Sequence, residues 1–176
     1  MIHIILFEPE IPQNTGNIFR TSVATNSFVH LIKPLGFSLS DKYLKRVALD
    51  YFKDVQYQVY EDYQDFLNKV QPPKIYYLTR YGYQNYTNIT YDLEQDIYLM
   101  FGKESTGISK EILASHLDAT FRIPTTTLVR SLNLSNCVAI VVYELLRQVE
   151  FSKLSFYEPE NYKGKDFLKN IKDKIN

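Results

Sequence analysis

Residues 1–33 read MIHIILFEPE IPQNTGNIFR TSVATNSFVH LIK, and this stretch decides the fold class. The apolar run Ile2–Phe7 predicts a buried strand, and Phe28–Lys33 predicts a second one. Between the two runs, Asn14–Asn26 has helical character. A strand, a helix and another strand in this order indicate a parallel sheet that helices cover on both faces.

The same alternation continues along the chain. We expect further strands at Gln56–Tyr60, Ile75–Thr79, Ile97–Phe101 and Ala119–Ile123. We expect further helices at Asp41–Phe52, Asp62–Val70, Ser109–His116 and Asn133–Val149. The polar, Tyr-rich stretch Arg80–Asp96 is typical of a surface loop. Since no repeat or linker divides the chain, the sequence predicts one α/β domain at residues 1–150 and a solvated C-terminal extension at residues 151–176.

Charge and cysteine content narrow the class of protein. The 20 Lys and Arg residues balance 20 Asp and Glu residues, so any nucleic acid must be bound by a local basic patch. The single Cys137 excludes an internal disulfide and favours a reducing compartment. No run reaches the ~18–20 apolar residues of a membrane span, so we expect a cytoplasmic protein without membrane contact. The three histidines lack metal-ligand spacing, so we expect no metal.

Two polar blocks follow expected strands and could carry chemistry. Asn14-Thr15-Gly16-Asn17-Ile18-Phe19-Arg20 opens the first helix, which Asn14 or Thr15 could simply cap. Phe101–Ser109 contains Gly102 and Gly107, and it nearly matches a phosphate-binding loop. The lysine of that loop is missing, which argues against a nucleoside triphosphatase. We expect the backbone at Gly102 to approach a ligand closely.

A third polar block leads into the last strongly apolar helix. It reads Arg130-Ser131-Leu132-Asn133-Leu134-Ser135-Asn136, and Ser131 or Asn133 could be no more than the helix N-cap. Backbone N–H groups also point outward at a helix start, so the start of this helix suits a polar ligand. The helix is apolar on nearly all sides, which predicts burial inside the domain or against a partner. Within it, Cys137 is typical of a small core residue rather than a nucleophile.

In this order, the three blocks resemble the SPOUT superfamily of knotted RNA methyltransferases. The resemblance is strongest to the SpoU-type branch, and within it to the small enzymes that methylate the tRNA wobble ribose. It runs from Ile2 to about Gln148 and is carried by Phe7–Arg20, Pro34–Phe37, Leu49–Tyr51, Phe101–Glu104 and Ser131–Asn136. The sequence departs from the family at Thr125, where Met is usual, and at Lys103, where Pro is common.

The resemblance implies a fold, a cofactor and partners. The implied fold is a parallel α/β sheet flanked by helices, with a C-terminal deep trefoil knot. The implied cofactor is S-adenosylmethionine (AdoMet), held by Leu78, Gly102, Gly107, Ile123, Ser131, Leu132 and Asn133. The implied partners are a second copy of the chain, in a homodimer, and the anticodon loop of a tRNA.

The resemblance also implies roles for single residues. Arg20 matches the family's catalytic arginine. Because a guanidinium has a pKa above ~12 and only donates hydrogen bonds, we expect Arg20 to clamp the target phosphate and stabilise alkoxide charge rather than act as a base. Asn17 and Glu104 would hold Arg20 or the ribose, while Ser131 and Asn133 would complete the site at the start of the last helix. The candidate RNA contacts are Arg20, Lys103, Arg130, Lys42, Lys45 and Arg46, although the run Lys42–Arg46 is equally typical of a solvated face.

The expected activity is methylation of the ribose 2′-hydroxyl of the wobble nucleotide, a cytidine or modified uridine, with leucine tRNAs as the expected carriers. A minimal enzyme reads its target best in a single-stranded loop, where bases can splay out. The alternatives are 2′-O-methylation elsewhere in tRNA or rRNA, an inactive RNA-binding module on the same fold, and a nucleotide-binding metabolic enzyme. The last is disfavoured because G-x-G-x-x-G is absent.

Overall fold

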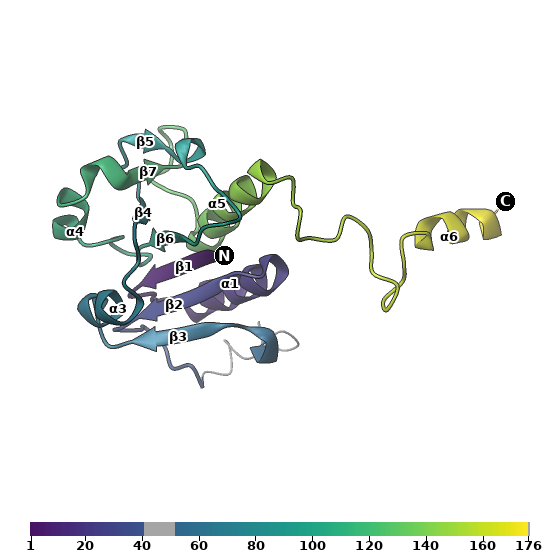
Figure 1. The fold of residues 1–176 in the computed structure, drawn as a ribbon, viewed down its shortest axis with the longest axis horizontal. Helices are drawn as coiled ribbons and strands as arrows, with labels where there is room; N and C mark the ends of the chain where they lie inside the picture. The colour runs from purple at the N-terminus through teal and green to yellow at the C-terminus, as the bar shows by residue number, and fades with distance from the viewer. Residues whose placement is uncertain (41–51, 176) are drawn as a thin grey trace.

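The computed structural model describes residues 1–40 and 52–175. Its centre is a parallel sheet in which we see seven strands, in the order β3-β2-β1-β6-β4-β7-β5 (Figure 1). The strands are β1 (Ile2–Phe7), β2 (Phe28–Ile32), β3 (Tyr57–Tyr60), β4 (Ile75–Leu78), β5 (Gln84–Asn85), β6 (Ile97–Phe101) and β7 (Thr120–Arg122). All the pairings between these strands are parallel, which confirms the predicted parallel α/β sheet.

Helices and short 3-10 turns connect the strands. The α-helices are α1 (Pro12–Thr25), α3 (Tyr63–Val70), α4 (Lys110–Ala114), α5 (Leu134–Gln148) and α6 (Phe167–Ile175). The 3-10 turns are η1 (Phe52–Asp54), η2 (Tyr86–Asn88) and η3 (Leu117–Ala119). The expected helix Asp41–Phe52 lies outside the described residues except for Phe52, which begins η1. The candidate RNA contacts Lys42, Lys45 and Arg46 also lie outside them.

Two expectations about irregular segments need correction. The stretch Arg80–Asp96 is not loop throughout, because β5 and η2 form within it. Local sequence could not indicate a strand there, since β5 has only two residues and is held by its partner β7. The C-terminal extension contains the helix α6, which we also did not expect, and it runs away from the sheet (Figure 1).

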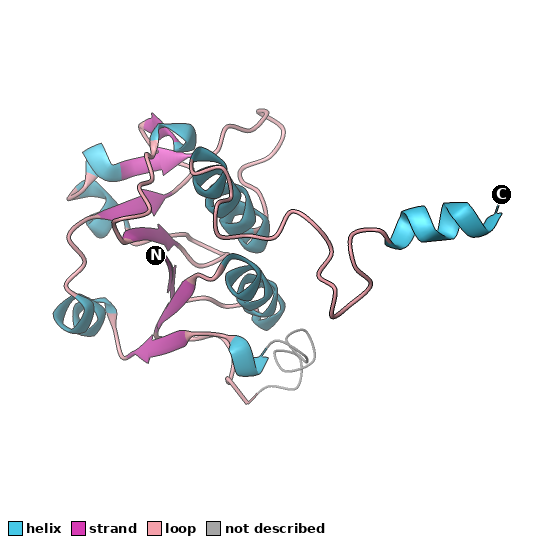
Figure 2. Ribbon diagram, turned by 45° about the vertical axis from the view of Figure 1, so that its right-hand side comes forward, coloured by secondary structure: helices cyan, strands magenta, loops and turns pink. Residues whose placement is uncertain are grey.

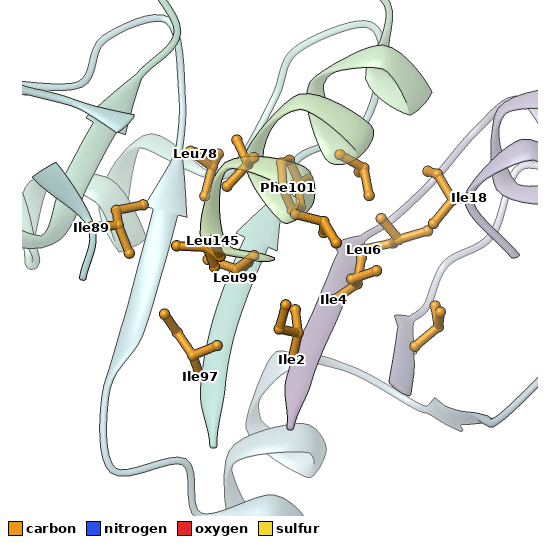
Figure 3. Packing of buried hydrophobic residues seen from close by; sticks show 14 of the residues in the cluster. Ile2, Ile4, Leu6, Ile18, Leu78, Ile89, Ile97, Leu99, Phe101 and Leu145 are labelled. Atoms are coloured by element: carbon orange, nitrogen blue, oxygen red, sulfur yellow. The ribbon is translucent and has the colours of Figure 1, made fainter. Parts of the chain in front are cut away.

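The apolar residues of β1 divide between the two faces of the sheet. Ile2, Ile4 and Leu6 pack with α1 and α5 in one cluster, part of which Figure 3 shows. Ile5 and Phe7 pack on the opposite face in a second cluster, to which α3 and α4 contribute. Both faces are therefore buried, which explains why β1 is a continuous apolar run rather than an alternating one.

The first helix begins differently from the prediction. Pro12 occupies the first turn of α1, and the N-cap residue Ile11 makes no side-chain capping bond. Asn14 and Thr15 lie inside the helix, where both are buried, so neither is the cap that we considered. A proline suits this position because its missing N–H would have no helical partner. The side chains of Asn14 and Thr15 therefore face the interior of the fold.

The last helix of the domain is buried on one side only. Helices α5 and α1 lie side by side against the sheet (Figure 2). Val138, Val142 and Leu145 of α5 are fully buried, but Tyr143 is 45% exposed and Ile140 is half-buried. Of the two alternatives that we predicted, burial inside the domain holds for one side of α5 only, and burial of its outer face against a partner stays a prediction.

Candidate functional site

A cavity of about 480 Å³ lies where β4, β6 and β7 end. Open sheets of this type bind ligands at the carboxyl ends of their parallel strands. All the residues that we expected to bind the cofactor line this cavity, namely Leu78, Gly102, Gly107, Ile123, Ser131, Leu132 and Asn133. Glu104, Lys103 and Arg130 line it as well. The fold thus brings the second and third polar blocks together.

The loop after β6 closes on itself. The Gly107 N–H donates to the Lys103 carbonyl at 2.9 Å. A Cβ atom at Gly102 would lie 2.1 Å from the Ile108 nitrogen and 2.2 Å from the Gly107 carbonyl carbon. Gly102 therefore allows a close approach to the loop's own backbone, which we did not expect, and its approach to a ligand stays a prediction. Gly107 has a φ of +79° and faces open space, so it exposes bare backbone instead.

Glu104 ties this loop to the start of α1. Its carboxylate accepts hydrogen bonds from the backbone N–H groups of Glu10 at 2.9 Å and Ile11 at 3.3 Å. It also accepts one from the Asn14 side-chain amide at 2.8 Å. A carboxylate at a helix N-terminus interacts favourably with the helix dipole. Three donors thus already engage Glu104, which shapes the cavity through the backbone that it holds.

Two neighbouring contacts join the same loops. The Lys103 ammonium donates to the Glu8 carboxylate at 2.6 Å, and this hydrogen bond raises the pKa of Lys103. The Ser105 hydroxyl and N–H donate to the Glu10 carboxylate at 2.8 and 3.0 Å, and they lower the pKa of Glu10. We call Glu8, Glu10 and Glu104 the acidic clasp. Because Lys103 is paired with Glu8, an RNA phosphate would have to compete with the Glu8 carboxylate for the Lys103 ammonium.

Asn14 connects the first and third blocks. The Asn133 amide donates to the Asn14 side-chain oxygen at 3.0 Å. The Asn133 oxygen accepts from the Ser135 N–H at 2.9 Å, so Asn133 is indeed the N-cap of α5. Asn14 lines the cavity, whereas the sequence indicated only a possible helix cap at this position. A polar residue at a helix start looks the same in either role, so the pattern could not separate them.

The structure does not bring Arg20 and Asn17 to the cavity of their own chain. Both are exposed on α1 and are not among the described residues that line the cavity. They are three positions apart and therefore share one face of the helix. The three polar blocks thus separate into a cavity, which the second and third build, and an outer helix face, which carries Arg20.

Sequence reasoning missed several residues of the cavity wall. Thr79, Arg80 and Tyr81 follow β4 and line it, although we expected only Leu78 from that segment. Cys137 also lines it, so describing it as a core residue was incomplete. Burial raises the pKa of the Cys137 thiol, which keeps it protonated and unsuited to nucleophilic attack.

We also searched the described part of the chain for metal sites and for membrane-spanning helices. In residues 1–40 and 52–175 we find no group of three His, Cys, Asp or Glu side chains that could hold a metal ion. None of the helices seen there is both long and apolar enough to cross a membrane.

Comparison with known proteins identifies the family. The sequence model of the SpoU rRNA Methylase family matches residues 1–143. A relative from Geobacillus stearothermophilus is 49% identical over 88% of this chain and 99% of its own length. The tRNA (cytidine(34)-2′-O)-methyltransferase of Escherichia coli K12 is 41% identical over 86% of this chain and 96% of its own. A structure solved to study 2-OH methylation of C/U34 on tRNA is also similar, with 38% identity and a TM-score of 0.78 over 86% of this chain and 97% of that one. The chain therefore belongs to the SpoU rRNA Methylase family.

Proposed function

We propose that this chain methylates the ribose 2′-hydroxyl of the wobble nucleotide in tRNA. The target base is a cytidine or a modified uridine in the anticodon loop, and leucine tRNAs are its carriers. The names of its close relatives support this reaction, because they specify the same nucleotide and the same oxygen. The observation that carries the proposal is the cavity that the second and third polar blocks build at the strand ends.

AdoMet is the cofactor that we place in this cavity. The cavity volume of about 480 Å³ lies within the range of roughly 300–1,000 Å³ that is usual for small-molecule sites. Leu78, Ile123 and Leu132 offer apolar walls for an adenine ring, while Ser131 and Asn133 offer polar groups for a ribose or an amino acid. When bound, AdoMet supplies a methyl group made electrophilic by a positively charged sulfonium. The residues of this chain would hold it and orient the ribose toward it.

Arg20 would act on the RNA rather than on the cofactor. Its guanidinium can hold the target phosphate with two parallel hydrogen bonds and stabilise negative charge on the 2′-oxygen. Arg20 is exposed on α1, and the adjacent helix α5 has an open outer face. We therefore propose a homodimer in which these faces meet, so that Arg20 of one protomer reaches the cavity of its partner. Asn17 would position it, and Arg130 and Lys103 would contact phosphates.

The finer features of the fold belong to the same proposal. Residues 123–133 lead from β7 to the start of α5 past the Gly102–Gly107 loop, a route that suits the trefoil knot. Residues 1–150 would form the methyltransferase domain, with residues 151–176 as an extension. The cytoplasm would be its compartment, where tRNA is found and where Cys137 would stay reduced.

The test is mass spectrometry of nuclease-digested tRNA after incubation with the protein and AdoMet. We expect a 2′-O-methyl group at the wobble nucleotide. A methyl group found only in the tRNA body or in rRNA would favour the alternative position. AdoMet-independent RNA binding without any transfer would favour an inactive RNA-binding module.

A further inference from the structure

A second hollow adjoins the cofactor cavity. It has a volume of about 290 Å³ and is lined by Gly82, Tyr83, Gln84, Asn85, Arg122, Pro124 and Thr125. Arg122 and Thr125 line both spaces, so the two share a wall. A molecule that reacts in the first space can therefore extend into the second.

Thr125 stands on the wall that the two spaces share. The Thr125 hydroxyl is buried, and it has no hydrogen-bond partner among the described residues. An unmatched polar group therefore lies where the two spaces meet.

Exposed aromatic rings stand beside this wall. Tyr83 is 76% exposed and Tyr81 is 49% exposed, although both side chains are large and apolar. The Arg80 guanidinium lies 4.6 Å from the centre of the Tyr81 ring. Aromatic faces and arginine planes are the surfaces on which proteins stack unpaired RNA bases. Tyr83, whose ring has no cation or aromatic neighbour among the described contacts, is the better placed of the two for stacking.

The backbone under Tyr83 is held firmly. Its N–H donates to the Thr120 hydroxyl at 3.2 Å, and the next residues, in β5, pair with β7. At Gly82, a Cβ atom would lie 2.3 Å from the Phe121 carbonyl carbon, so the segment sits directly on β7. An exposed ring on a fixed backbone loses little freedom when it binds a ligand, which favours affinity.

The charge around the two spaces suits RNA. The described residues that line them include the basic side chains of Arg80, Arg122 and Arg130, besides Lys103, which is paired with Glu8. Glu104 is the one acidic residue in the same set, and three donors already engage it. A locally basic surface attracts phosphates even though the formal net charge of the chain is zero.

We propose that the second hollow binds the nucleotide next to the one that is methylated. Tyr83 stacks on its base, and Arg122, on the shared wall, contacts the phosphate between the two nucleotides. The inference rests on the proposed function, because it places the reacting ribose at the neighbouring cavity. It makes Tyr83 a binding residue that fixes the register of the anticodon loop on the protein.

The test compares Tyr83→Ala with Tyr83→Phe, which keeps the ring. The Kd for a fluorescently labelled anticodon stem-loop is measured by anisotropy, and the Kd for AdoMet by calorimetry. Tyr83→Ala should weaken RNA binding about tenfold, within the range of base–aromatic stacking. Tyr83→Phe should stay within about twofold of wild type, since a phenyl ring stacks as well. AdoMet binding should be unchanged in both variants.

Tyr162→Ala is the matched control, because Tyr162 is 73% exposed and lies in the extension, away from both spaces. Its RNA affinity should equal that of wild type. An unchanged RNA affinity in Tyr83→Ala, or an equal loss in Tyr83→Phe, would overturn the inference. The assay needs no catalysis. A wild-type protein that binds the loop without methylating the wobble ribose would therefore contradict the proposed reaction and leave the stacking role of Tyr83 standing.

Discussion

Single side chains decide how the cavity is built. The Glu104 carboxylate holds two backbone N–H groups and the Asn14 amide, and the Asn133 amide extends the chain of hydrogen bonds to α5. The sequence pointed to Glu104 and Asn133, because their blocks resemble a known family. It could not show that Glu104 faces backbone donors some 90 positions away, since that depends on how β1 and β6 pair.

We predict that Glu104→Ala weakens AdoMet binding and lowers the unfolding temperature. The substitution leaves the part-buried Glu10 N–H and Asn14 amide without their acceptor, and an unmatched buried donor costs about 1–3 kcal/mol. Calorimetry and thermal unfolding would measure both effects. Glu94→Ala, at an exposed residue between β5 and β6, is the control and should change neither. Wild-type AdoMet affinity in Glu104→Ala would show that the clasp does not shape the site.

The buried His30, which contacts His3, predicts how stability depends on pH. His3 Nδ1 and His30 Nε2 lie 2.9 Å apart, and His30 Nδ1 lies 2.7 Å from the Tyr60 hydroxyl. Burial, and then the neighbouring His3, lower the pKa of His30 to about 3. The unfolded chain takes up this proton near the ordinary pKa of 6.5, so it binds more protons than the folded chain between these values. Stability should therefore fall as the pH drops below about 6.5.

The His30 contribution to this slope should approach about 1.4 kcal/mol per pH unit. Urea unfolding at pH 7 and pH 5 would measure it, because most carboxylates titrate at lower pH. His30→Phe, which keeps an aromatic ring, should flatten the dependence. The prediction fails if wild type and His30→Phe lose the same stability over this interval.

At the scale of elements, apolar runs predicted strands well. Polar capping residues predicted the starts of α3, α4 and α5, at Asp62, Ser109 and Asn133, but not that of α1, whose N-cap is Ile11. β1, β2 and β6 match their expected positions within about a residue, because each is a buried apolar run. β5 was missed because the pairing of Gln84 and Asn85 with β7 makes it a strand, and their own propensity does not. Such long-range pairing leaves no local signal.

The Gly102–Gly107 loop gives a prediction at this scale. Gly102→Ala places a methyl group within 2.1–2.6 Å of the Ile108 and Gly107 backbone, so the loop must shift. We expect AdoMet affinity to fall at least tenfold by calorimetry. Gly107→Ala is a useful contrast, because its Cβ meets nothing within 4 Å and the change only strains a φ of +79°, at about 1–2 kcal/mol. If Gly102→Ala binds AdoMet normally, loop closure does not control the site.

At the scale of the whole molecule, Arg20 does not line the cavity of its own chain. Arg20 is exposed on α1, and the outer face of the adjacent α5 carries the half-exposed Tyr143. The sequence predicted an apolar α5 but could not tell which side a second chain would cover. Two chains that bury these faces together would complete the site.

We predict a homodimer at micromolar concentration by light scattering, and a monomer for Tyr143→Asp, which would place a charge in an apolar interface. Arg20→Ala should abolish methyl transfer while AdoMet binding persists. Mixing Arg20→Ala with Ser131→Ala should restore transfer, because a mixed dimer holds one intact Arg20 opposite one intact cavity. If the mixture stays inactive while mixed dimers form, Arg20 does not act across the interface.

The contacts that enclose the cavity also determine when the cavity can form during synthesis of the chain. The hydrogen bonds from Asn14 to Glu104 and from Asn133 to Asn14 span 90 and 119 positions. A ribosome delivers β1 and α1 first and the third block much later, at roughly 5–20 residues per second. A nascent chain that ends before Ser131 lacks one whole wall, however well its sheet has formed. The ability to hold the cofactor is thus among the last properties that the growing chain acquires.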